Sequence, residues 1–125
     1  MTTRARLTTV PWWSSEAFAI TMSRLEQIEA MLGEEPQDVF LNFSLAMELA
    51  SAGRPAEALP AFDHVLELDP KYHVAYLRKG LLLIDLGRLE EARRALTAGA
   101  AVAVECGDHH AADQMTGLLA TIRGS

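Results

Sequence analysis

Residue types in the middle of this chain recur 34 positions further on, as Gly87 does after Gly53. An arginine follows each of these glycines, Arg54 in one case and Arg88 in the other. The other matched pairs are Phe43 with Leu77, Ala46 with Gly80, Leu49 with Leu83, Glu57 with Glu91, Ala58 with Ala92, Ala61 with Ala95 and Phe62 with Leu96. Small residues let two helices cross closely, and large apolar residues fill the space beside the crossing. The spacing therefore predicts two copies of one helical hairpin.

Each copy has the same order of key residues, with small and apolar residues in a first helix, then an alanine and a large apolar residue in a second. Copy one, residues 39–72, supplies Leu45, Ala46, Leu49, Ala58, Phe62 and Pro70; copy two, residues 73–106, supplies Tyr76, Gly80, Leu83, Ala92 and Leu96. This order resembles the tetratricopeptide repeat, TPR, as found in the short TPR proteins common in bacteria. Copy two departs from the pattern at Lys79, where an apolar residue is usual, and at Val104, where proline is usual. The missing proline predicts that the last helix of this copy runs on.

The resemblance covers about 70 of the 125 residues. It implies an all-α fold, an α–α superhelix of helical hairpins with about two full repeats. The helices of the two copies are expected over about residues 37–51, 55–68, 71–86 and 89–105.

Two further helices are expected at the ends of the array. Apolar residues at intervals of three and four predict one helix over about residues 16–32, with Ser15 as its N-cap. Asp108 is a good N-cap for a second helix over about residues 108–122. Stacked repeats need terminal units with one polar face, so both helices are expected to cap the array.

The chain length indicates one domain. Residues 22–125 are expected to form it. Residues 1–21 show no recognisable repeat architecture and are expected to be a disordered or loosely packed extension, with Met22 suited as a native start.

Composition excludes several classes of function. The net charge of −6 argues against a broad surface for nucleic acid, which needs clustered basic residues. No run of 18 or more apolar residues is available to span a membrane. The one cysteine, Cys106, cannot form an internal disulfide, which fits a reducing compartment and predicts a cytoplasmic protein.

Few residues could carry chemistry. Cys106, His109 and His110 are close in sequence, but they lack the fourth ligand of a structural zinc site, and we interpret them as a turn with exposed imidazoles. No phosphate-binding loop, nucleophile elbow or H-E-x-x-H motif occurs. The sequence predicts no enzyme, no metal and no cofactor.

The resemblance implies a binding site on the concave face of the array, where the first helices of TPR repeats present fixed positions. Carried onto this chain, these positions are Phe40, Phe43, Met47 and Ala50 in copy one and Val74, Leu77, Leu81 and Ile84 in copy two, and the nearby polar residues are Arg78 and Asp85. Many TPR grooves hold a terminal carboxylate with lysine, asparagine and arginine. Here Phe43 and Met47 replace the first two, so this mode of binding is disfavoured and only Arg78 fits it.

An apolar concave face predicts a protein partner, because so much apolar surface is seldom left bare. Phenylalanine and methionine suit an adaptable groove that takes a peptide or an amphipathic helix. We therefore expect a protein-binding adaptor. The alternative is a structural module whose apolar face mediates self-association as a homodimer or larger homo-oligomer.

Overall fold

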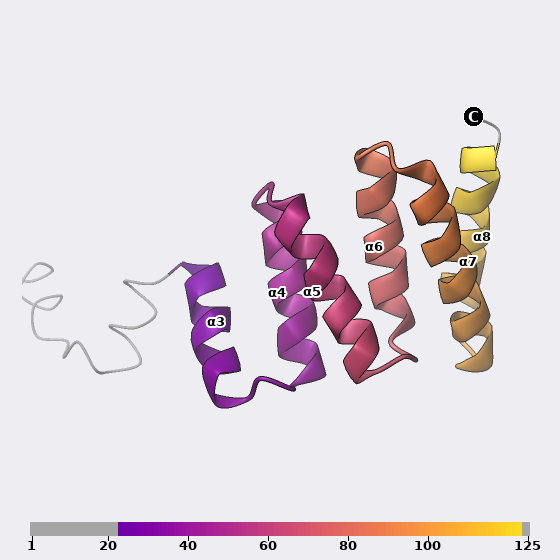
Figure 1. The fold of residues 1–125 in the computed structure, drawn as a ribbon. Helices are drawn as coiled ribbons and strands as arrows, with labels where there is room; N and C mark the ends of the chain where they lie inside the picture. The colour runs from indigo at the N-terminus through magenta and orange to yellow at the C-terminus, as the bar shows by residue number, and fades with distance from the viewer. Residues whose placement is uncertain (1–22, 124–125) are drawn as a thin grey trace, which may run out of the picture.

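The computed structural model describes residues 23–123, and the regular structure in this range is helical (Figure 1). Its helices are α3 (Arg24–Glu34), α4 (Val39–Ser51), α5 (Pro55–Leu68), α6 (His73–Asp85), α7 (Leu89–Glu105) and α8 (His109–Arg123). They alternate in direction and lie side by side, which confirms the predicted all-α array of antiparallel hairpins. The ends of α4 to α7 agree with the predicted ranges to within about two residues.

The helix that precedes the two copies begins later than predicted. It starts at Arg24 and not near Glu16, and its N-cap is Ser23 and not Ser15. The Ser23 hydroxyl accepts from the amide of Glu26 at 3.2 Å, and the Glu26 carboxylate accepts from the amide of Ser23 at 2.9 Å. This reciprocal capping box satisfies two amides that a helix end leaves unpaired. Residues 1–22, including the predicted start of this helix, lie outside the described residues.

The turns between α4 and α5 and between α6 and α7 are one structure repeated. Gly53 has φ +74° and Gly87 has φ +76°, a backbone conformation that glycine adopts without a Cβ clash. The next amide in each turn donates to a carbonyl near the end of the first helix, at 3.0 Å for Arg54 and 2.9 Å for Arg88. The Gly-Arg pairs that recur 34 residues apart in the sequence therefore form the same hairpin turn in both copies.

Small side chains lie where the helices approach most closely. Ala58 and Ala92, which the matched pairs place at these contacts, are fully buried, as is Ala46. In the second hairpin Gly80 packs so tightly that a Cβ there would lie 2.6 Å from a methyl carbon of Leu96. Such contacts leave no room for larger residues, which explains why the repeated positions are alanine or glycine.

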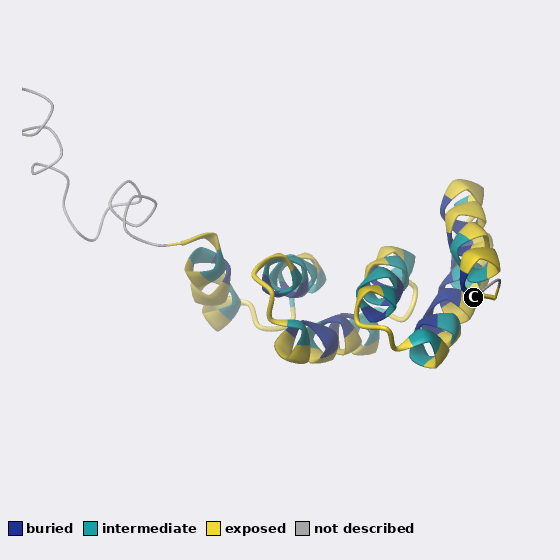
Figure 2. Cartoon of the chain, turned by 90° about the horizontal axis from the view of Figure 1, so that it is seen from above, coloured by how far each residue is buried: buried dark blue, intermediate teal, exposed yellow. Residues whose placement is uncertain are grey.

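The apolar interior forms two clusters along the array. One lies between α4 and α5 around Phe62 and Val65, and the other lies among α6, α7 and α8 around Leu83, Leu96 and Met115. The partly buried Leu82 packs against both. Figure 2 shows the buried residues on the sides of the helices that face their neighbours. Each hairpin therefore has its own core, and α6 joins the two.

Helix α7 is longer than α5, as the absence of proline at Val104 predicts. It continues to Glu105, and a tight turn at Gly107 leads directly into α8. The predicted N-cap of α8 is confirmed, since an oxygen of Asp108 accepts from the amide of Ala111 at 3.1 Å. Helix α8 then packs back along α7 and covers the open end of the second core.

Asp108 also ties the start of α8 to the start of α6, because its second oxygen lies 2.8 Å from Nε2 of His73. The hydrogen bond from the Ala111 amide, followed by that from His73, holds the pKa of Asp108 below its usual 3.8. A lowered pKa stabilises the fold above the usual value, and this contribution is lost as pH falls through the lowered one.

We therefore expect Asp108→Ala to lower the thermal unfolding midpoint by several degrees at pH 7 and by less at pH 3. Asp108→Asn keeps an acceptor for the Ala111 amide and should recover part of the loss. Thermal melts of the three proteins at both pH values measure this. An equal loss for both variants would show that the hydrogen bond from the Ala111 amide contributes nothing and that the loss comes from the charge beside His73.

Candidate functional site

The predicted binding residues lie on α4 and α6, and most of them line a shallow groove made of three hollows in series. The first hollow, between α3 and α4, has a volume of about 310 Å³ and is lined by Arg24, Phe40, Phe43, Ser44, Met47, Glu48 and Ser51. The second, between α4 and α6, is about 210 Å³ and is lined by Met47, Ala50, Ser51, Phe62, Arg78, Leu81, Leu82 and Asp85. The third, between α6 and α8, is about 390 Å³ and is lined by Leu77, Arg78, Leu81, Gln114, Gly117, Leu118 and Thr121.

Shared residues join these hollows into one surface, which we call the groove. Met47 lines the first and second hollows, while Arg78 and Leu81 line the second and third. The first helices of the two hairpins, α4 and α6, therefore do not bury each other's side chains completely along the groove. Their apolar side chains remain partly accessible between them.

The side chains of the first hollow differ in how firmly they are held. Phe43 packs against the core, with its ring centroid 6.1 Å from that of Phe62 and 5.1 Å from that of Tyr72. Burial raises the pKa of Tyr72. Phe40, in contrast, is 67% exposed. Phe43 thus forms a rigid wall, and Phe40 is available at the rim.

Arg78 supplies a positive charge between the second and third hollows. It is exposed, and no carboxylate in the described part of the chain forms an ion pair with it. At the far end of the groove Arg24 pairs with Glu48, at 2.7 Å between Nε and Oε1. The centre of the groove therefore combines apolar side chains with one unpaired guanidinium.

Two predicted residues lie outside the three hollows. Val74 is at the start of α6 and is 37% exposed, and Ile84 packs against the core of the second hairpin. The three hollows thus bring together Phe40, Phe43, Met47, Leu77, Arg78 and Leu81, while Val74 and Ile84 are on the same helix α6 without lining them.

Repeat spacing did not reveal the contribution of α8 to the groove. Counting 34 residues on from Leu77 and Leu81 gives Ala111 and Met115, which are buried and do not line it. The longer α7 shifts and turns α8, so that Leu118 and Gly117 face the third hollow instead. Apolar residues recur at intervals of three and four in residues 108–122, and Leu118 is one of them, so this pattern was the signal that could have found Leu118.

The residues first considered as metal ligands do not converge. Cys106 is exposed, and its thiol donates weakly to the carbonyl of Lys71 at 3.8 Å. Across residues 23–123, no three His, Cys, Asp or Glu side chains are placed so that they could share a metal ion. Within the same range, none of the helices combines the length and apolarity needed to cross a membrane.

Comparisons with known proteins agree on the architecture. A family model described as tetratricopeptide repeat matches residues 49–113. The uncharacterized protein MJ0572 of Methanocaldococcus jannaschii is 38% identical over 60 residues, which is 48% of this chain and 70% of that protein.

Solved structures match over most of the described array. Protein BPP2914 from Bordetella parapertussis is 29% identical with a TM-score of 0.73, covering 82% of this chain and 90% of its own. The TPR2B domain of yeast Sti1, in complex with pHsp70, is 22% identical with a TM-score of 0.74 and 80% of each chain covered. PcrH, in complex with the chaperone binding region of PopD, is 16% identical with a TM-score of 0.75, covering 80% of this chain and 76% of its own.

Proposed function

This chain belongs to the tetratricopeptide repeat family, and from that premise we propose that it is an adaptor that holds a peptide or helix of a partner protein in the groove. The observation that carries the proposal is the continuity of the three hollows through Met47, Arg78 and Leu81. A series of hollows beside apolar walls gives an elongated ligand several points of contact. Methionine and leucine side chains can adjust to different partner residues.

The solved complexes support this use of the fold. The structure of yeast Sti1 contains pHsp70, and that of PcrH contains a region of PopD, so arrays of this shape do hold protein segments. The mode of binding differs from a carboxylate clamp. Phe43 and Met47 stand where clamp side chains would be, which favours apolar contacts with a single charged contact at Arg78.

Self-association is the second candidate, and the exposure of Phe40 favours it. A phenylalanine that is 67% exposed at the rim of an apolar hollow can be covered by a second copy of the chain. The two candidates differ in their dependence on concentration, because only self-association makes the mass of the purified protein rise with its concentration.

Photo-crosslinking tests the adaptor function directly. A photo-reactive benzoylphenylalanine in place of Phe40 should cross-link a partner in cells, and the same residue in place of Val104 should not. Val104 is a matched control because it is 54% exposed and lies on α7, away from the groove. An adduct of twice the chain mass would support self-association. Equal labelling from both positions would contradict a role for the groove.

We further propose that the protein acts in the cytoplasm, by binding and not by catalysis, and without a cofactor. Its partners are proteins, and they are neither nucleic acid nor membrane. The net charge of −6 supports the exclusion of nucleic acid. A bacterial source is supported by the similarity to the Bordetella parapertussis protein, while the relative from Methanocaldococcus jannaschii is archaeal.

We also propose that residues 22–125 form one folding unit and that residues 1–21 are an extension to it. The capping box of Ser23 and Glu26 supports a boundary here, because it completes the start of α3 without upstream residues. A chain that begins at Met22 should keep the helix content and cooperative melting of the full chain, as measured by circular dichroism. Loss of cooperative melting in this shorter chain would place Trp12, Trp13 or Phe18 in the core.

A further inference from the structure

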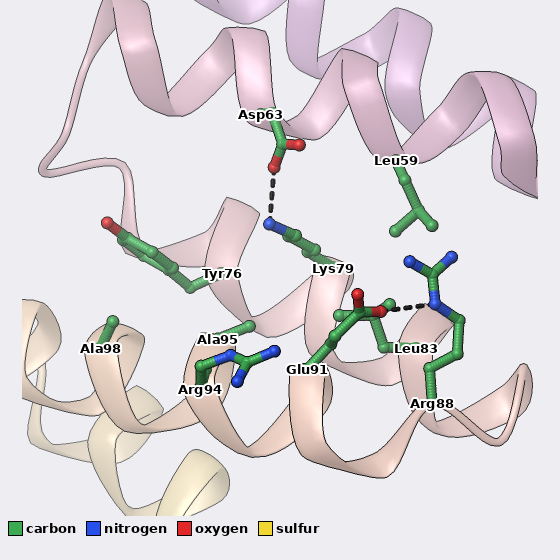
Figure 3. A pocket seen from close by; sticks show the side chains of 10 residues that line it. All are labelled: Leu59, Asp63, Tyr76, Lys79, Leu83, Arg88, Glu91, Arg94, Ala95 and Ala98. Carbon is green, nitrogen blue, oxygen red and sulfur yellow. Dashed lines mark hydrogen bonds and ion pairs between the residues drawn. The ribbon is translucent and has the colours of Figure 1, made fainter.

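A second cleft lies between α5 and α7, across α6, and shares no lining residue with the groove (Figure 3). Its volume is about 390 Å³, and its lining residues are Leu59, Asp63, Tyr76, Lys79, Leu83, Arg88, Glu91, Arg94, Ala95 and Ala98. Helix α6 presents Tyr76, Lys79 and Leu83 to this cleft and Leu77, Arg78 and Leu81 to the groove. Because these two sets differ by roughly half a turn of the helix, the two sites lie on opposite sides of it.

Basic side chains outnumber acidic ones in this cleft. Lys79 pairs with Asp63 at 2.6 Å, and Arg88 pairs with Glu91 at 2.5 Å. Arg94 is the third basic residue, and no carboxylate within residues 23–123 lies in ion-pair contact with it. The cleft therefore has a net positive charge in a protein whose overall charge is −6.

All three basic side chains of the cleft affect the carboxylate of Glu91. Figure 3 shows the guanidinium groups of Arg88 and Arg94 on either side of Glu91. The hydrogen bond from Arg88, together with the charges of Arg88, Arg94 and Lys79, lowers the pKa of Glu91. The carboxylate of Glu91 thus lies near three cations. Asp63 and Glu91 together balance two of these cations, so one positive charge is in excess.

Some of the charged residues of the cleft recur in copy one and others do not. The pair of Arg88 and Glu91 recurs as Arg54 and Glu57 in copy one, so it belongs to the hairpin turn. The other two basic residues have no such equivalent. Leu45, which packs against the first core, takes the place of Lys79, and Pro60 takes the place of Arg94. Lys79 and Arg94 are therefore additions to the second hairpin that the repeat does not require.

The floor of the cleft is apolar. Leu59, Leu83 and Ala95 are buried beneath the charged side chains, and Tyr76 lines the cleft with them. A ligand that combines an anionic head with an apolar body would match both parts. Guanidinium groups suit carboxylate and phosphate oxygens because they can donate two parallel hydrogen bonds.

We propose that this cleft is a second binding site, which takes a carboxylate or phosphate group carried on an apolar body. Arg94 supplies the principal contact to the anionic head, and Lys79 adds positive charge. Tyr76 and Ala98, which line the cleft and are not buried, contact the apolar body. This site is independent of the groove and of any partner held there.

Nuclear magnetic resonance titration of the full-length chain tests the site with defined probes. N-acetyl-leucine should give saturable amide shifts at residues of α5, α6 and α7 that line the cleft, and N-acetyl-leucinamide, which lacks the charge, should not. Phenyl phosphate is the parallel probe for a phosphate head, and the tighter of the two anions is the preferred probe for the variants below. No saturable shift with either anion, or equal shifts with the amide, would overturn the proposal.

Matched variants assign the contact. Arg94→Gln should weaken binding of the preferred probe by about tenfold or more, because it removes a charge-assisted contact. Arg93→Gln makes the same change of charge one residue away, where the side chain pairs with Glu90 and does not line the cleft, and should leave affinity unchanged. Equal affinity for the Arg94→Gln variant and the original chain would overturn the assignment. Leu81→Glu, in the groove, should not alter binding of these probes, so this site can fail or succeed separately from the adaptor function.

Discussion

Replacing Gly99 by alanine is expected to lower the free energy of unfolding by about 1–3 kcal/mol through overpacking. Gly99 is buried in α7 between α6 and α8. A Cβ added there would lie 2.5 Å from Cβ of Tyr76 and 2.6 Å from Sδ of Met115. The Cβ of Tyr76 moves only with the backbone of α6, so at least one of the two neighbouring helices must shift.

Helix propensity opposes this loss and makes the test sharper. Alanine is favoured over glycine inside a helix by about 1 kcal/mol, which is the whole effect expected where there is free space. Gly117 in α8 provides that case, since nothing lies within 4 Å of its added Cβ. Gly117→Ala should raise the thermal midpoint and Gly99→Ala should lower it by roughly 5–15 °C. A raised midpoint for both variants would contradict the close packing around Gly99.

The contrast between Gly80 and Gly99 shows what the repeat could predict. Gly80 matches Ala46 at a spacing of 34, so a small residue at the hairpin contact was expected, and Leu96 does pack directly against it. Gly99 matches Val65, a larger residue that is fully buried in copy one. Its need for glycine arises from Tyr76 of α6 as well as from Met115 of α8, and Asn42 takes the place of Tyr76 in copy one. The period therefore predicts the contacts made by residues that match between the copies. It does not predict those made by residues that differ or by the terminal helix.

The candidate groove was predictable to the same extent. Residues on α4 and α6 were placed by register, because those helices begin 34 residues apart and end at equivalent turns. The residues of α8 were not, because three additional residues of α7 relative to α5 change where α8 starts. The departure at Lys79 was visible in the sequence, but its pairing with Asp63 and its place in the second cleft depend on how the two hairpins meet.

The second large effect is expected from Leu81→Glu, because Leu81 lines both the second and the third hollow of the groove. In the free protein its side chain is partly exposed, so a carboxylate there can reach water and the fold should persist. A bound partner would exclude that water, and an unpaired buried charge is costly. Truncation of a central anchor typically weakens binding by about 30-fold or more, and a charge should do at least as much.

The readout is the yield of the adduct formed through the photo-reactive residue at position 40, compared with the circular dichroism spectrum of the same variant. We expect the adduct to disappear while the spectrum stays nearly unchanged. Val104→Glu places the same charge on an exposed apolar position outside the groove and should change neither. Retention of the adduct by Leu81→Glu would show that the partner does not occupy the centre of the groove. Unfolding of this variant would show that Leu81 is a core residue, and binding would then have to use another surface.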